Sequence, residues 1–113
     1  MNLPLNEFAS VILDSSGNGT ARIGPNAHGV VWYPTVASVK VSTAVKSPTA
    51  LIFAGSSATS DAFVDGTYTG EQNSTDSING NVLRLGSYVF AVWTGGDVGA
   101  QATVSVVGTK DIP

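Results

Sequence analysis

The sequence contains no cysteine among its 113 residues, and it has only one histidine and one methionine. Without cysteine the chain can form neither a disulfide nor a thiolate metal site. A single imidazole also excludes a zinc site built from two or three histidines. A domain without a disulfide framework is typical of synthesis in a reducing cytoplasm. We therefore expect a fold that is stabilised by packing and hydrogen bonds alone.

Charge is scarce as well, because 12% of the residues are charged and the formal net charge is −3. The five basic residues are scattered: Arg22, Lys40, Lys46, Arg84 and Lys110. Such spacing offers no basic stripe to a phosphate backbone, so nucleic acid is not expected as a partner. No apolar run approaches the roughly 20 residues that span a bilayer. The N-terminal residues lack the basic and apolar regions of a signal peptide, so we expect cytoplasmic synthesis and no membrane partner.

What the chain does carry is the period-two alternation of β-strands. It is clearest in residues 100–107, where alanines and valines alternate with polar residues, and in the bulky run of residues 88–93. The glycine-rich loop Gly95–Gly99 lies between these two runs. The pattern predicts a β-hairpin, with Trp93 in the core and Gly99 allowing a close approach of backbone.

Further strands are predicted on the same grounds at residues 7–14, 20–23, 30–33, 37–45, 49–54, 62–64, 67–69 and 82–85. The first two flank Asn18-Gly19, a pair that favours a tight hairpin turn. Pro34 predicts a strand end, an edge or a bulge. No window has helical spacing with caps.

Strands at intervals of about 8–12 residues predict an all-β fold: a single β-sandwich of seven to eight mainly antiparallel strands, immunoglobulin-like or jelly-roll. The length of 113 residues fits one domain, 1–113. A short N-terminal arm (residues 1–5) and a C-terminal tail (residues 109–113) are expected to flank the sandwich. These termini and the polar segment 55–80 are the expected recognition surfaces.

The sequence offers little to catalysis. A hydrolytic triad would have to use His28, and no serine lies in a Gly-x-Ser-x-Gly elbow. The loop Gly95–Gly99 precedes a strand and lacks the Lys-Ser/Thr ending of a phosphate-binding loop. We therefore expect a protein that is not an enzyme and that needs no cofactor.

Aromatic residues provide the candidate binding site. Trp32, Tyr33 and Tyr68 are the residue types with which β-sandwich carbohydrate modules stack on sugars. Because adjacent strand residues point to opposite faces, only one of Trp32 and Tyr33 can face outward. A glycan is accordingly one candidate ligand.

Carboxylates provide a second candidate site, for calcium. Asp61, Asp65 and Asp76 lie in the polar segment, and Asp97 lies in the glycine loop. Calcium accepts oxygen ligands from irregular loops, but the spacing does not match an EF-hand. The alternative is that these aspartates cap turns through nearby backbone N–H groups. Capping is the default, and no metal is expected.

Four segments together carry a resemblance to a known group: residues 14–25 (DSSGNGTARIGP), Trp32, residues 65–70 (DGTYTG) and residues 93–100 (WTGGDVGA). They resemble small β-sandwich virion proteins of tailed actinobacterial bacteriophages. The resemblance implies a capsid decoration protein or a head or tail accessory, located in the virion. Its partner would be the major capsid protein or another virion protein, and a homo-oligomer would be expected, with a trimer favoured. The alternatives are a carbohydrate-binding or adhesion module of a tail tip or fibre, and a small calcium-dependent adhesion domain.

Overall fold

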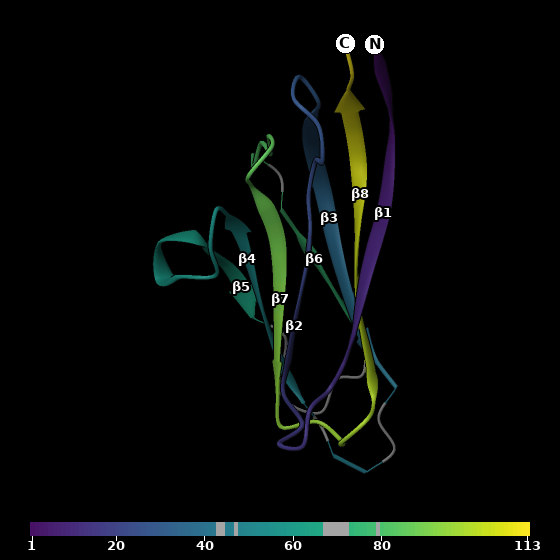
Figure 1. The fold of residues 1–113 in the computed structure, drawn as a ribbon, viewed down its shortest axis with the longest axis vertical. Coiled ribbons are helices and arrows are strands. Elements are labelled where there is room, and N and C mark those ends of the chain that lie inside the picture. Colours follow the sequence, from purple (N-terminus) through teal and green to yellow (C-terminus); the bar gives the residue numbers. More distant parts are fainter. Residues whose placement is uncertain (43–44, 47, 67–72, 79) are drawn as a thin grey trace.

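The structure is a computed structural model that describes residues 1–42, 45–46, 48–66, 73–78 and 80–113 (Figure 1). Its elements are β1 (Asn2–Ile12), β2 (Gly19–Ile23), β3 (Val31–Val41), β4 (Thr49–Gly55), the 3-10 turn η1 (Ser60–Ala62), β5 (Phe63–Gly66), β6 (Asn73–Ser77), β7 (Tyr88–Thr94) and β8 (Gln101–Asp111). Helix is almost absent from the described residues. The prediction of an all-β chain is therefore confirmed.

The strands form two antiparallel sheets. The first has the order β1-β8-β3-β6 and the second the order β2-β7-β4-β5. Three strands of each sheet form its body, and a short strand completes one edge of each. This edge strand is β6, beside β3, in the first sheet and β5, beside β4, in the second. Strands from the two halves of the chain pair in reverse order: β1 with β8, β2 with β7, β3 with β6 and β4 with β5.

One hydrophobic core joins the two sheets. Alternate residues of β8, namely Ala102, Val104 and Val106, are fully buried and face residues of the second sheet such as Ile52 and Trp93. Trp93 is 1% exposed, so the prediction that it belongs to the core is confirmed. Burial of this kind contributes roughly 25 cal/mol per Å² of apolar surface, which makes the core the main stabilising term.

The two predicted hairpins are wrong. Strands β7 and β8 lie in different sheets, and so do β1 and β2. The glycine loop and the turn at Asp14–Asn18 each carry the chain from one sheet to the other. Turn residues supply a change of direction, and they do not specify whether the next strand pairs in the same layer. The backbone also differs locally, because Gly17 has the positive φ of +77° and neither Asn18 nor Gly19 does.

The predicted arm and tail are parts of the longest strand pair. In the ladder between β1 and β8, Asn2 lies opposite Asp111 and Leu5 lies opposite Gly108. The Met1 ammonium is 2.9 Å from the Asp111 carboxylate, and it donates a hydrogen bond of 2.7 Å to the Ile112 carbonyl. Both termini therefore lie at the same end of the first sheet (Figure 1).

Strand β3 unites two runs that the sequence predicted as separate strands. Its register against β8 shifts between Pro34 and Val36, so the proline marks a β-bulge inside one strand. Gly108 of β8 lies against this bulge, where a Cβ atom would collide with the backbone of Tyr33 and Pro34. The predicted strand at residues 82–85 is only an isolated bridge between Leu83 and Trp32. The predicted strand at residues 67–69 lies outside the described residues.

Candidate functional site

The outer face of the first sheet is the candidate functional site. Register decides which side chains reach it: Phe8 lies opposite Ser105, Ser10 opposite Thr103, and Lys40 opposite Thr103 from the other side. Residues that lie directly opposite each other in a ladder share a face, and the buried valines of β8 define the other one. The outer face therefore combines small hydroxyl residues with a phenylalanine that is 71% exposed.

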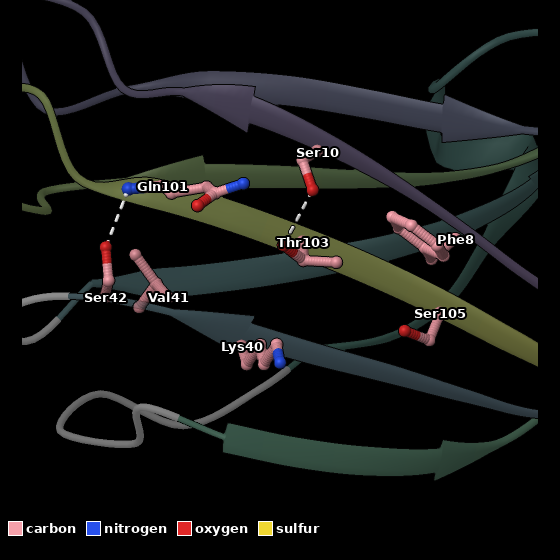
Figure 2. Close-up of a pocket in the computed structure, with 8 residues that line it drawn as sticks. All are labelled: Phe8, Ser10, Lys40, Val41, Ser42, Gln101, Thr103 and Ser105. Carbon is pink, nitrogen blue, oxygen red and sulfur yellow. Dashed lines mark hydrogen bonds between the residues drawn. The ribbon is translucent and has the colours of Figure 1, made fainter.

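A hollow of about 550 Å³ lies on this face (Figure 2). It is lined by Phe8, Ser10, Lys40, Val41, Ser42, Gln101, Thr103 and Ser105, which come from β1, β8, β3 and the residue after β3. Its size lies within the range of ligand pockets, roughly 300–1,000 Å³. The hollow is an open depression over neighbouring strands of one sheet.

Two hydrogen bonds order the floor of the hollow. The Oγ of Ser10 and the Oγ1 of Thr103 are 2.9 Å apart, which links the outer faces of β1 and β8. The backbone N–H of Gln101 donates to the Oγ of Ser42 at 2.8 Å, and the N–H of Ser42 donates to the Gln101 carbonyl at 2.9 Å. Figure 2 shows both side-chain contacts crossing from strand to strand. The hydroxyl groups are thus held in place by partners within the sheet.

The lining of the hollow consists almost entirely of neutral side chains. Lys40 supplies one ammonium group, and the lining residues include neither a carboxylate nor an imidazole. Proton transfer needs a positioned acid or base, and a serine needs an adjacent base before it acts as a nucleophile. The lining offers hydrogen-bond donors, acceptors and an aromatic ring. Such a surface can hold a partner, and Lys40 is the one titratable side chain in its lining.

The outer face of the second sheet differs, because two of its phenylalanines are covered. Phe53 is 8% exposed and Phe90 is 7% exposed. The rings of Tyr88 and Phe90 meet edge to face with centroids 5.7 Å apart, and the Arg22 guanidinium lies 4.3 Å above the Tyr88 ring. The exposed aromatic side chains of the sheet faces, among the residues whose burial is described, are therefore Phe8 (71% exposed) and Tyr33 (42%), and both lie on the first sheet.

The structure does not assemble the predicted aromatic platform. Trp32 is 5% exposed and belongs to the core, where its backbone pairs with that of Leu83. Tyr33 is 42% exposed and lies on the opposite side of β3. Tyr68 lies outside the described residues. Trp32 instead lines a smaller hollow of about 350 Å³ together with Glu7 and Lys110.

The predicted calcium ligands lie in separate elements. Asp61 is exposed in η1, Asp65 lies in β5 and Asp76 lies in β6, and the two strands belong to different sheets. The described residues include no group of three or more acidic or histidine side chains that could hold an ion. Asp97 accepts backbone hydrogen bonds from Val45 (2.9 Å) and Lys46 (3.2 Å). It thereby ties the glycine loop to the connection between β3 and β4.

Asp14 also caps a turn. Its Oδ1 accepts hydrogen bonds from the backbone N–H groups of Ser16 (2.9 Å) and Asn18 (3.0 Å). The bond from Asn18, followed by that from Ser16, lowers the pKa of the Asp14 carboxyl below its ordinary value of 3.8. These bonds favour the charged form of the carboxylate. Asp14 therefore organises the corner between the two sheets and lies away from the hollow.

His28 lies in the loop before β3 and does not line the candidate site. It lines a hollow of about 340 Å³ with Arg84 and Leu85, near the start of β3. No carboxylate lines this hollow. The lining of this hollow thus offers no carboxylate that would orient the imidazole in a triad.

Sequence reasoning missed every residue of the hollow. A signal was present, because the outward positions of residues 8–12 place a serine between two bulky apolar side chains, and those of residues 101–105 are all polar. That signal names a site only after the pairing is known, since Ser10 and Thr103 are 93 positions apart.

Compared with known proteins, the chain matches no family model and has no significantly similar curated relative. Among the described residues no helix has the length and apolar character to cross a membrane.

Proposed function

We propose that this chain is a non-enzymatic structural protein of a bacteriophage virion, which decorates the outer surface of the major capsid shell. The observation that carries the proposal is the outer face of the first sheet. Its exposed apolar side chains, Phe8 (71% exposed), Ile12 (61%) and Val107 (39%), surround uncharged hydroxyl groups. Exposed apolar side chains that gather on one face are typical of a protein-binding surface.

The strand pairing supports the same class. Pairs β1–β8, β2–β7, β3–β6 and β4–β5 are those of one long antiparallel hairpin wrapped into two sheets. This supports a jelly-roll sandwich in preference to the immunoglobulin-like alternative. Jelly rolls are the fold of viral capsid and lectin domains. The fold is consistent with the proposal, but a fold does not identify a binding site. The choice of site rests on the outer face of the first sheet.

Low charge suits a protein that repeats over a lattice. A shell presents many copies of one site, so modest contacts at each of them suffice to hold a decoration layer. The groups in the hollow are neutral apart from Lys40. Binding through apolar and hydroxyl groups should therefore depend only weakly on salt.

The proposal is tested by co-sedimentation with capsids assembled from the major capsid protein. Ser105 lies outward near the centre of β8 and lines the hollow, so Ser105→Trp would place a large ring across the face. Val98 is 64% exposed in the glycine loop, and Val98→Trp adds the same ring elsewhere. We expect the wild type and Val98→Trp to co-sediment and Ser105→Trp to remain in the supernatant. Equal behaviour of the two variants would contradict docking through this face.

A second candidate function is glycan binding by a module of a tail tip or fibre. It is favoured by the aromatic ring of Phe8 beside the hydroxyl groups of Ser10 and Thr103, since sugars are bound by stacking and hydrogen bonding together. The site is then the hollow and not the Trp32 surface. A glycan array with the wild type and Phe8→Ala tests this function. A glycan that binds the wild type and not Phe8→Ala would support glycan binding at the hollow, and the absence of any bound glycan would contradict it.

A further inference from the structure

Strand β1 has a free edge whose hydrogen-bonding groups can be assigned. It is the outermost strand of the first sheet and has 11 residues. At its ends, Ile112 N–H donates to the Met1 carbonyl and Leu13 N–H donates to the Ala100 carbonyl. Because an antiparallel ladder alternates, odd-numbered residues of β1 bond to β8 and even-numbered residues direct their N–H and C=O groups away from it.

The even-numbered residues show how this edge is protected and where protection ends. Pro4 lies at an even position, so its missing N–H would have faced the free edge, as expected of proline in an edge strand. From Asn6 to Ile12 the edge carries neither a proline nor a lysine or arginine, so its protection there is limited to the inward-facing charge of Glu7. Long exposed edges are templates for the addition of another strand. Within the described part of the chain no strand covers this edge.

We propose that a second copy of this chain occupies the edge, with the two β1 strands antiparallel about a two-fold axis at Ala9. In this register Phe8 lies opposite Ser10 of the second copy, and Asn6 lies opposite its Ile12. Each of the four resulting pairs joins two even-numbered residues and exchanges two backbone hydrogen bonds. A register centred on Phe8 would place Pro4 opposite Ile12, where the proline lacks a donor.

Charge does not oppose the pairing of two identical β1 edges. Glu7 is the one charged residue of β1, and it lies opposite the buried Val106, hence on the inner face. In the proposed register it meets Val11 of the second copy. The two Glu7 carboxylates are then four residues apart along the ladder, about 13 Å, which exceeds the Debye length at physiological salt. No like charges therefore face each other.

The pairing also covers exposed apolar surface. Phe8 and Ile12 are 71% and 61% exposed, and both lie on the outer face beside the edge. In the proposed register Phe8 lies diagonally across from Ile12 of the second copy, within reach of an aromatic ring. Dimerisation would thus extend the first sheet across two copies and join their outer faces. It would do so whether or not the protein binds a capsid.

The test combines sedimentation equilibrium with amide hydrogen exchange of the full chain. We expect a monomer–dimer equilibrium, in which the amides of Asn6, Phe8, Ser10 and Ile12 become protected as concentration rises. The odd-numbered amides of β1 bond to β8 and should be protected at every concentration. A monomer at all concentrations, a trimer, or a dimer whose even-numbered amides stay unprotected would each overturn the proposal.

Two variants at one position isolate the backbone contribution. Asn6→Pro removes an edge-facing N–H from each copy and leaves the bonds to β8 intact, while Asn6→Ala keeps the N–H and removes only the side chain. Two lost hydrogen bonds predict a dissociation constant raised by about thirtyfold for Asn6→Pro. Asn6→Ala should dimerise as the wild type does. Equal dimerisation of the two variants would contradict pairing along this edge, whereas capsid co-sedimentation tests the proposed function separately.

Discussion

Replacing Gly17 by alanine should destabilise the fold through two effects that a matched control separates. Gly17 has φ of +77°, and an added Cβ would overlap the carbonyl of Gly96. Its own carbonyl accepts the Gly96 N–H at 2.9 Å, and the Gly95 N–H donates to the Asn18 side chain at 3.2 Å. The substitution therefore strains the turn and also pushes it away from the glycine loop.

The control is Gly95→Ala. Gly95 has the same φ of +77°, but an added Cβ would have no neighbour within 4 Å. The left-handed conformation costs a non-glycine residue about 1–2 kcal/mol, which both variants bear. Gly17→Ala loses in addition the two hydrogen bonds between turn and loop, at about 1 kcal/mol each. We expect free energies of unfolding lowered by about 3–4 kcal/mol for Gly17→Ala and about 1–2 kcal/mol for Gly95→Ala.

Urea unfolding followed by tryptophan fluorescence measures this difference. Trp32 and Trp93 are 5% and 1% exposed, so both report unfolding. With a slope of about 1–3 kcal/mol per molar urea, the midpoint of Gly17→Ala should lie about 1 M below that of Gly95→Ala. Equal midpoints would refute the argument that the turn and the glycine loop dock through their backbones.

Three further predictions concern the sheet corners and the core. Asp97→Ala should lower the free energy of unfolding by about 2–4 kcal/mol, because the N–H groups of Val45 and Lys46 lose their charged acceptor; urea unfolding tests this. Because the pKa of the Asp14 carboxyl is lowered in the folded state, this carboxylate adds stability above the ordinary value of 3.8, and the added stability is lost as the pH falls through the folded-state pKa. Below pH 3.8 the Tm of the wild type should therefore approach that of Asp14→Ala. A Tm difference that does not shrink in acid would contradict this. Trp93→Ala should cost about 3–5 kcal/mol, since the side chain is 1% exposed; a smaller loss would show that it is not a core residue.

The sequence was informative about strands and about which of their faces is buried. Alternation in residues 100–107 predicted the inward side chains of β8, and Ala102, Val104 and Val106 are fully buried. Burial could be predicted here because successive side chains of a strand point to opposite faces, so the period of two in the sequence shows which residues share a face. The all-β class follows from several such segments and the lack of helical spacing.

Pairing could not be predicted in the same way. Asn18-Gly19 and the loop Gly95–Gly99 were interpreted as hairpin turns, yet each carries the chain to the other sheet. A turn within a hairpin and a turn between two sheets need the same small and flexible residues. Which of the two turns forms depends on contacts between residues that are distant in sequence. The pairing of Asn2 with Asp111 is the extreme case. Gly99 was expected to permit close backbone approach, whereas the structure places that approach at Gly96 and Gly17.

The candidate site eluded prediction for the same reason. Trp32 was chosen for its chemistry, but burial removes its ring from the outer surface. The hollow is lined by Phe8, Lys40 and Gln101, among others, and these residues form no motif in the sequence. They become a site only when three strands place them side by side. Binding surfaces on sheet faces therefore become visible only with the register.

The proposed docking of the outer face of the first sheet on a capsid shell is tested most directly by a reconstruction of the virion. We expect regularly repeated density for this chain on the shell, with the side chains of Ser105 and Lys40 turned toward the capsid protein. Particles without that density, or with this face turned to solvent, would contradict it.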